Sequence, residues 1–276
     1  METLATRFLQ ISKVDLKASR VLYENGLYAP AIFHLQQCVE KAIKSLLIFL
    51  GAAPKDTEEL EKWLRKRTGH QVAKNLNKIM KIYWSHVMGK LPFAKSLMKR
   101  FSNFIEEQSE EYNSAVKVIE KIDITNHEEV EKRIDWALKI LETRVFETSW
   151  VSQKFYNEHK KILSLMPNTV STRLLESLRQ VMEPLTCAVA LLTLSLILEK
   201  FEQYSRYPSV KNPKVGPSLF KEDYPLISKF NSFINSINKV LESQERRVKP
   251  ENIDLEEAKQ RVEEQIHKMK IYRKTE

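Results

Sequence analysis

Apolar residues recur at every third or fourth position along most of this chain, which is the spacing of one face of an α-helix. The first segment with this pattern covers residues 4–25 and ends at Asn25-Gly26, a pair typical of helix termini. Pro30 suits the first turn of a second helix, which stops at Gly51. The short link between them predicts an antiparallel helix pair. The predicted buried stripe of the first helix is Phe8, Ile11, Val14, Ala18 and Val21.

The same helical period continues through the rest of the chain, interrupted by prolines and glycines. The segments that predict helices are residues 56–67, 70–87, 93–165 with a turn at 122–126, 171–204, 222–243 and the charged tail that follows Pro250. The turn carries a capping box, Thr125-x-x-Glu128, which predicts that Thr125 caps the start of the next helix. Pro184 is expected to kink or divide its helix, and residues 205–220, with three prolines and one glycine, predict a loop.

The most apolar stretch, from Leu185 to Leu198, is fourteen residues long. It is too short to cross a bilayer, so no membrane segment is expected. An apolar run without a polar face must be enclosed, and we predict that it forms the central core helix. Its predicted packing partner is the stripe of the second helix, represented by Leu35, Cys38, Ala42 and Leu46.

Composition narrows the fold class to all-α, because five glycines in 276 residues leave few positions for tight hairpins or a phosphate-cradling loop. The formal charge of +9 permits attraction to RNA, DNA or another anionic partner. The 36 acidic residues are nevertheless interleaved with 45 basic ones, and a solvated mixed surface is the simpler interpretation. Cys38 and Cys187 lie among apolar residues without metal-ligand spacing, which predicts reduced core cysteines, no metal site and a cytoplasmic protein. The amino terminus lacks the features of a signal peptide, and no cofactor is expected.

Two neighbouring segments carry a family pattern. Residues 23–31 read YENGLYAPA, and residues 35–44 read LQQCVEKAIK. Together they resemble the opening helix pair of a HEPN domain, in which one helix ends in Gly-x-Tyr, a small residue begins the next, and a Gln-x-x-x-Glu-Lys-x-x-Lys core follows. Gly69-His70 and Arg206-Tyr207-Pro208, similar to the RYP signature of many members, occur in the order that the family shows.

The resemblance covers roughly residues 1–87 and 185–245, and it implies an HEPN-like antiparallel helical bundle. The domain division that follows is a bundle formed by residues 1–90 and 185–245, an inserted helical region at 91–184, and a charged carboxy-terminal helix at 246–276. The resemblance says nothing about the last two parts.

Active HEPN ribonucleases resemble one another in an Arg followed, after four to six residues, by a His. There the imidazole transfers a proton and the guanidinium holds the phosphate. Arg65 and His70 match this spacing and are the candidate catalytic pair. Arg261 and His267 also match the spacing, but they lie outside the region that resembles the family. With six histidines and many arginines, such matches arise by chance. A helix break at Gly69 separates Arg65 from His70, so the simpler interpretation of His70 is a helix-start residue. His34, one residue from the apolar stripe, is expected at the surface of its helix or at the boundary of the buried face, and Asp15 is expected to be a satisfied structural carboxylate.

The candidate nucleotide- or RNA-binding residues are Arg206, Tyr207, Arg67 and Lys62. The structural alternative for Arg206 is a pairing with a carboxylate where Pro208 stops the helix. No His follows Arg206 within range, which counts against RNA cleavage. The resemblance implies a module that binds RNA, a nucleotide or a partner, with a homodimer and a companion nucleotidyltransferase of a toxin–antitoxin pair as expected partners. A metal-independent ribonuclease and a helical scaffold for protein interactions are the open alternatives.

Overall fold

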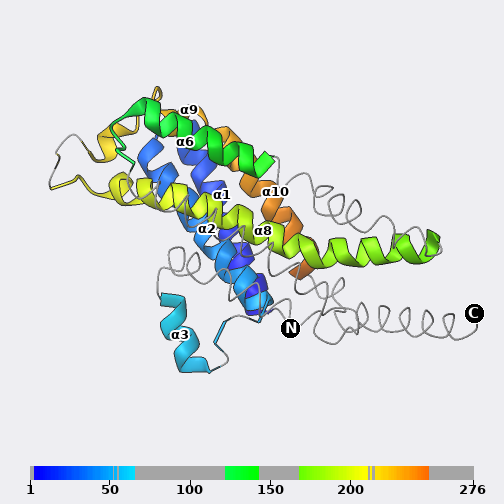
Figure 1. The fold of residues 1–276 in the computed structure, drawn as a ribbon. Helices are drawn as coiled ribbons and strands as arrows, with labels where there is room; N and C mark the ends of the chain where they lie inside the picture. Colours follow the sequence, from blue (N-terminus) through cyan, green and yellow to red (C-terminus); the bar gives the residue numbers. More distant parts are fainter. Residues whose placement is uncertain are drawn as a thin grey trace, which may run out of the picture.

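The computed structural model describes residues 3–51, 53–54, 56–65, 122–142, 168–210, 212 and 215–248. Within these ranges the secondary structure is helical, as predicted, and no strand occurs. The helices, drawn in Figure 1, are α1 (Leu4–Glu24), α2 (Tyr28–Phe49), α3 (Thr57–Arg65), α6 (His127–Ile140), α8 (Asn168–Arg206), α9 (Pro225–Ser228), α10 (Phe230–Val248) and the 3-10 turn η2 (Pro217–Leu219). The helices predicted over 70–87, over most of 93–165 and beyond residue 250 lie outside the described residues.

The turn between α1 and α2 forms as the sequence predicts. Gly26 takes a φ of +72°, which glycine adopts without a steric penalty. The Leu27 N–H donates to the Leu22 carbonyl at 2.9 Å and the Gly26 N–H to the Tyr23 carbonyl at 3.0 Å, the bonding pattern of a Schellman motif. This motif satisfies the last carbonyls of α1 and reverses the chain, so α2 packs antiparallel along α1.

The predicted buried face of α1 is wrong. The side chains of Ile11, Val14 and Val21 are 47%, 67% and 48% exposed. The buried face is instead Ala5, Leu9, Ser12, Asp15, Leu16 and Ser19. Serine hydroxyls decide this orientation: Ser12 donates to the Cys38 carbonyl, Ser19 to the Ala31 carbonyl and, from α2, Ser45 to the Ala5 carbonyl, each at 2.8 Å. Small side chains let the two helices approach closely, and each buried hydroxyl gains an acceptor.

The long helix α8 crosses the hairpin and packs on α2 (Figure 1). The prediction for residues 185–198 is confirmed, because Ala190, Leu191, Leu194 and Leu198 are fully buried and the predicted α2 stripe lies in the same core. Pro184 is buried and α8 continues through it rather than dividing. In the described part of the chain, no helix combines the length and apolarity that crossing a membrane requires.

Helix α6 lies within the segment expected as an insertion, yet its buried residues join the core beside α8 and α9. Ile134 and Leu141 are fully buried, and Tyr224 donates its hydroxyl proton to the Ile124 carbonyl at 2.9 Å. The predicted capping box is wrong by one residue: Asn126 caps α6 by accepting from the Glu129 N–H. Thr125 is unavailable because its N–H and hydroxyl both bond to Asp123.

The closing helix, predicted as one element over 222–243, consists of α9 and the longer α10. The Ser228 hydroxyl donates to the Pro225 carbonyl at 2.9 Å, a local bond that competes with helix continuation, and α9 ends at Ser228. Phe230 at the start of α10 stacks on Tyr23 near the end of α1, while Glu245 near the end of α10 bonds to Lys13 at 2.7 Å. Helix α10 therefore runs antiparallel to α1.

Candidate functional site

Arg206 is the last residue of α8, and its guanidinium is held from three sides. Nη2 lies 2.7 Å from Oε1 of Glu202, one turn earlier on the same helix. The guanidinium carbon lies 5.1 Å from the centre of the Phe33 ring on α2 and 5.3 Å from that of Tyr207, both within cation–π range. The Glu202 side chain is 2% exposed whereas that of Arg206 is 32% exposed, so the carboxylate anchors a cation that still reaches solvent.

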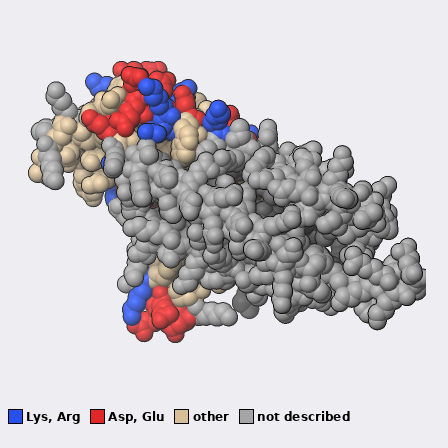
Figure 2. Space-filling view, viewed as in Figure 1, with Lys and Arg blue, Asp and Glu red and all other residues tan. Residues whose placement is uncertain are grey.

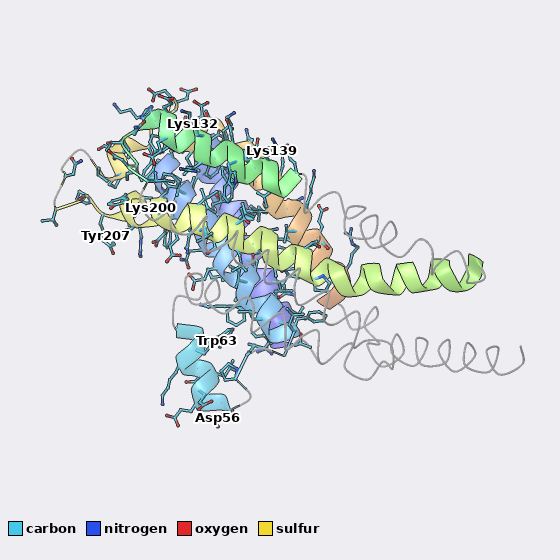
Figure 3. The ribbon with its side chains drawn as sticks, viewed as in Figure 1. Asp56, Trp63, Lys132, Lys139, Lys200 and Tyr207 are labelled. Atoms are coloured by element: carbon cyan, nitrogen blue, oxygen red, sulfur yellow. The ribbon has the colours of Figure 1, made fainter. Side chains whose placement is uncertain are left out.

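Tyr207 follows α8 immediately and is 62% exposed, which is unusual for a large aromatic side chain. Figure 3 shows it at the end of α8, beside the loop that leads to η2. An exposed ring next to a fixed guanidinium offers a stacking surface beside N–H groups that can donate hydrogen bonds to a phosphate.

The loop after Tyr207 folds back, and contacts between its two ends hold it in place. The Ser209 N–H donates to the Val215 carbonyl at 2.6 Å. Gly216 sits so close to Pro208 that a Cβ added there would lie 2.9 Å from the Pro208 Cα. Phe220 then anchors the loop by packing edge-on against Phe201 and Tyr224. Residues that are distant in the sequence thus determine where Tyr207 is presented.

A second polar cluster joins α1 to α2. Asp15 Oδ1 lies 3.0 Å from His34 Nδ1, and Asp15 Oδ2 accepts a short hydrogen bond from Lys41 Nζ. The expectations that Asp15 is a satisfied carboxylate and that His34 lies at the boundary between the buried and exposed faces of its helix are confirmed. The pairing itself was not predicted, although the hairpin contains the signal: residues equally far from Gly26 face one another, so Asp15 faces the stretch from His34 to Lys41.

The two clusters meet at Phe33-His34. The rings of Phe33 and His34 pack edge-to-face with centres 5.3 Å apart, and the Phe33 ring also makes the cation–π contact with Arg206. Three helices, α1, α2 and α8, therefore contribute to one polar surface region. In it, a histidine with a carboxylate on Nδ1 leaves Nε2 for an external proton donor or acceptor.

The remaining predicted site residues fall elsewhere. Lys62 lies on α3 and pairs with Glu58 at 2.6 Å, and Figure 3 shows α3, marked by Trp63, well apart from Tyr207. The side chain of Arg65 and the residues Arg67 and His70 lie outside the described residues, as do Arg261 and His267.

The charged surface that can be seen is mixed. Figure 2 shows acidic and basic side chains intermingled over α6 and α3. Exposed pairs such as Lys132–Glu128 account for this pattern. Among the residues that the structure describes, no three His, Cys, Asp or Glu side chains gather as metal ligands would.

A model of the family described as HEPN domain matches residues 5–145, about half of the chain. This chain belongs to the HEPN domain family. The match includes the α1–α2 hairpin, whose sequence carried the resemblance, and α6. Residues 185–245, with the Arg206-Tyr207-Pro208 segment, lie beyond it.

A protein of Methanocaldococcus jannaschii named "Putative toxin MJ1304" is 40% identical to this HEPN-domain chain over 47 residues. The aligned segment is 17% of this chain and 31% of that protein, so the similarity spans about a third of the relative's length. No solved structure matches the chain significantly.

Proposed function

We propose that this HEPN-domain protein binds RNA or a nucleotide at the end of α8, with Arg206 on a phosphate and Tyr207 stacked on a base. The observation that carries the proposal is the guanidinium of Arg206, held between the rings of Phe33 and Tyr207 with Glu202 behind it. Arginine has five N–H donors in a fixed plane, so the bond to Glu202 leaves donors for a ligand.

Glu202 also sets a limit on affinity, because its negative charge offsets that of Arg206. A lone phosphate would gain little from such a pair, whereas a ligand with both a phosphate and a base gains stacking as well. Base stacking on an aromatic side chain contributes about 1–3 kcal/mol. The exposed Tyr207 therefore favours a nucleotide or single-stranded RNA over inorganic phosphate.

The test measures binding of a fluorescently labelled single-stranded RNA by anisotropy at two salt concentrations. Arg206→Ala and Tyr207→Ala should each weaken binding about tenfold, which corresponds to about 1.4 kcal/mol. Arg206→Lys keeps the charge but loses the planar stacked group, and should recover only part of the affinity. Lys132→Ala removes one positive charge on α6 and is the matched control. Equal losses in Lys132→Ala and Arg206→Ala would point to diffuse charge attraction and contradict the proposal.

We further propose that the protein forms a homodimer and pairs with a nucleotidyltransferase in a toxin–antitoxin-like system in the cytoplasm. The family membership and the name of the Methanocaldococcus relative support this proposal. Light scattering at tens of micromolar tests the dimer. Co-expression with a nucleotidyltransferase encoded beside it, followed by purification through a tag on one protein, tests the pair. If the tagged protein purifies without the nucleotidyltransferase, a helical scaffold that binds some other protein would describe this chain better.

The second candidate function is metal-independent RNA cleavage. The Asp15–His34 pair favours it, because a carboxylate on Nδ1 orients an imidazole for proton transfer through Nε2. The sequence-based candidates for the same chemistry, Arg65 and His70, remain predictions. The assay incubates RNA with purified protein in excess chelator and compares wild type, His34→Ala and His70→Ala. Cleavage that is lost in one variant assigns the function to that residue, and intact RNA in all three supports the binding module.

A further inference from the structure

The outer face of α1 is an apolar stripe that the described fold leaves uncovered. It consists of the exposed Leu4, Ile11, Val14 and Val21, with the half-buried Phe8 and Ala18 between them. Helices α2 and α10 pack on the other sides of α1, so the stripe has no partner among the described elements. Val14 at its centre is 67% exposed. A row of largely exposed apolar side chains at helical spacing is typical of a surface that another helix covers.

The rim of this stripe is basic on the side that faces α10. Lys17 and Arg20 are exposed, and Lys13 reaches across to Glu245 on α10. Two copies of this face would bring like charges together, which disfavours a second copy of α1 as the occupant. A helix with a matching apolar stripe and acidic flanks fits better.

The sequence after α10 supplies such a segment. Its apolar positions are Leu255, Ala258, Val262, Ile266 and Met269, which fall on one helical face. Residues 251–264 hold six acidic and two basic side chains. Ile11 to Val21 spans about 15 Å of helix and Leu255 to Ile266 about 16.5 Å, so these parts of the two rows are similar in length.

The exit point of the chain brings the two together. Helix α10 runs antiparallel to α1 and ends at Val248, three residues after the bond between Glu245 and Lys13. Proline cannot continue a helix, so a reversal at Lys249-Pro250 would direct the following segment back along α1 from the level of Lys13. A helix in that register would carry its acidic residues past Lys13, Lys17 and Arg20 and place Ala258 beside Val14.

We propose that residues 251–269 form an amphipathic helix that packs on the exposed apolar stripe of α1 in the same chain. This intramolecular contact is separate from the RNA or nucleotide site at the end of α8. It removes the exposed side chains of Ile11, Val14 and Val21 from water and places the acidic segment along the basic rim of α1.

Hydrogen exchange on the full-length chain tests the contact. In wild type, the amides of residues 251–269 should exchange at least about tenfold more slowly than in an unstructured peptide, because a docked helix protects its backbone. Val14→Glu should abolish that protection while leaving α2 and α8 unchanged. Val210→Glu makes the same substitution at a loop residue that is 99% exposed, and should behave like wild type. Absent protection in wild type, or protection that survives Val14→Glu, would overturn the proposal.

Disulfide trapping distinguishes the same chain from a second one. In the full-length protein, Val14→Cys combined with Ala258→Cys should form an intramolecular disulfide, and the native Cys38 and Cys187 are buried and do not interfere. Val14→Cys with Gln260→Cys, whose second cysteine lies on the opposite helix face, is the matched control and should react about tenfold more slowly. Equal rates in both pairs, or disulfides that join two chains, would reject the intramolecular contact.

Discussion

Asp15 on α1 binds His34 and Lys41 on α2 through its two carboxylate oxygens, and Asp15 Oδ1 lies 3.0 Å from His34 Nδ1. The two partners are seven residues apart, which places them two turns apart on one face of α2. One side chain therefore fixes both the register and the rotation of the hairpin. It also orients the imidazole on which the candidate cleavage activity would depend.

Asp15→Ala should lower the free energy of unfolding by about 2 kcal/mol, because it leaves the ammonium of Lys41 and the ring of His34 in a half-buried position without their acceptor. Urea denaturation followed by circular dichroism measures the change. Glu58→Ala, which breaks the largely exposed pair with Lys62, is the control and should cost less than about 0.5 kcal/mol. Similar losses in both variants would show that burial of the Asp15 cluster adds nothing.

Gly216→Ala should displace the loop that presents Tyr207, because the new Cβ would lie 2.9 Å from the Pro208 backbone. We expect a small loss of stability, about 1 kcal/mol, and a clear loss of RNA affinity, since the core under the loop remains packed. Thermal unfolding and anisotropy measured on the same sample separate the two effects. Ser218→Ala, in the neighbouring exposed turn, is the control. Unchanged RNA binding in Gly216→Ala would disconnect this loop from the site.

Tyr224→Phe should destabilise the contact between α6 and α9 by about 1–2 kcal/mol at neutral pH, because the buried Ile124 carbonyl loses its donor. The ring itself stays, so packing against Phe201 and Phe220 is kept. Chemical denaturation measures the difference. A variant as stable as wild type would mean that water replaces the lost hydroxyl.

The same residue predicts a pH dependence. Burial raises the pKa of Tyr224 above its ordinary value of about 10, so above pH 10 the unfolded chain releases a proton that the folded chain keeps. Stability from this group is therefore complete below pH 10 and falls by about 1.4 kcal/mol per pH unit above it. Tyr224→Phe lacks this loss, so its stability curve should converge with that of wild type between pH 9.5 and about 11. Parallel curves would contradict the burial effect.

Cys38 should be unreactive in the folded protein. Burial raises the pKa of its thiol to about 12, so almost no thiolate exists at pH 8. Ellman's reagent should titrate neither cysteine in native buffer and both in denaturant, since Cys187 is also buried. Val210→Cys adds a thiol at a 99% exposed position and should react at once, as the positive control. Rapid native labelling of Cys38 would indicate that the α1–α2 contact opens.

Local features of the sequence determined the helices, the Gly26 turn and the enclosure of residues 185–198. Each depends on residues close together in the chain: apolar spacing, a glycine able to take positive φ, and a run with no polar face. The Arg206–Glu202 pair is of the same kind, because residues four apart on a helix are neighbours. The sequence offered a carboxylate partner as the structural alternative for Arg206, without naming Glu202.

The face of α1 that is buried was decided only by the tertiary structure. Both faces of α1 carry apolar side chains at helical spacing, and the sequence pattern favoured the one with Ile11 and Val14. Ser12 and Ser19 on the other face donate hydrogen bonds to backbone carbonyls of α2. Their small size permits a close approach of the two helices that branched side chains would block. Spacing along one helix contains no information about acceptors on another.

The candidate site divides in the same way. Arg206 and Tyr207 stand out in the sequence as the end of a helix before a proline, but Phe33, which carries the guanidinium, is more than 170 residues away and reaches it only because α8 crosses α2. Asp15 and His34 are likewise brought together by the turn at Gly26. The chain itself specifies which side chains have the right chemistry. Which of them act together is decided by helix crossing, because contacts between distant residues depend on how helices pack and not on local pattern.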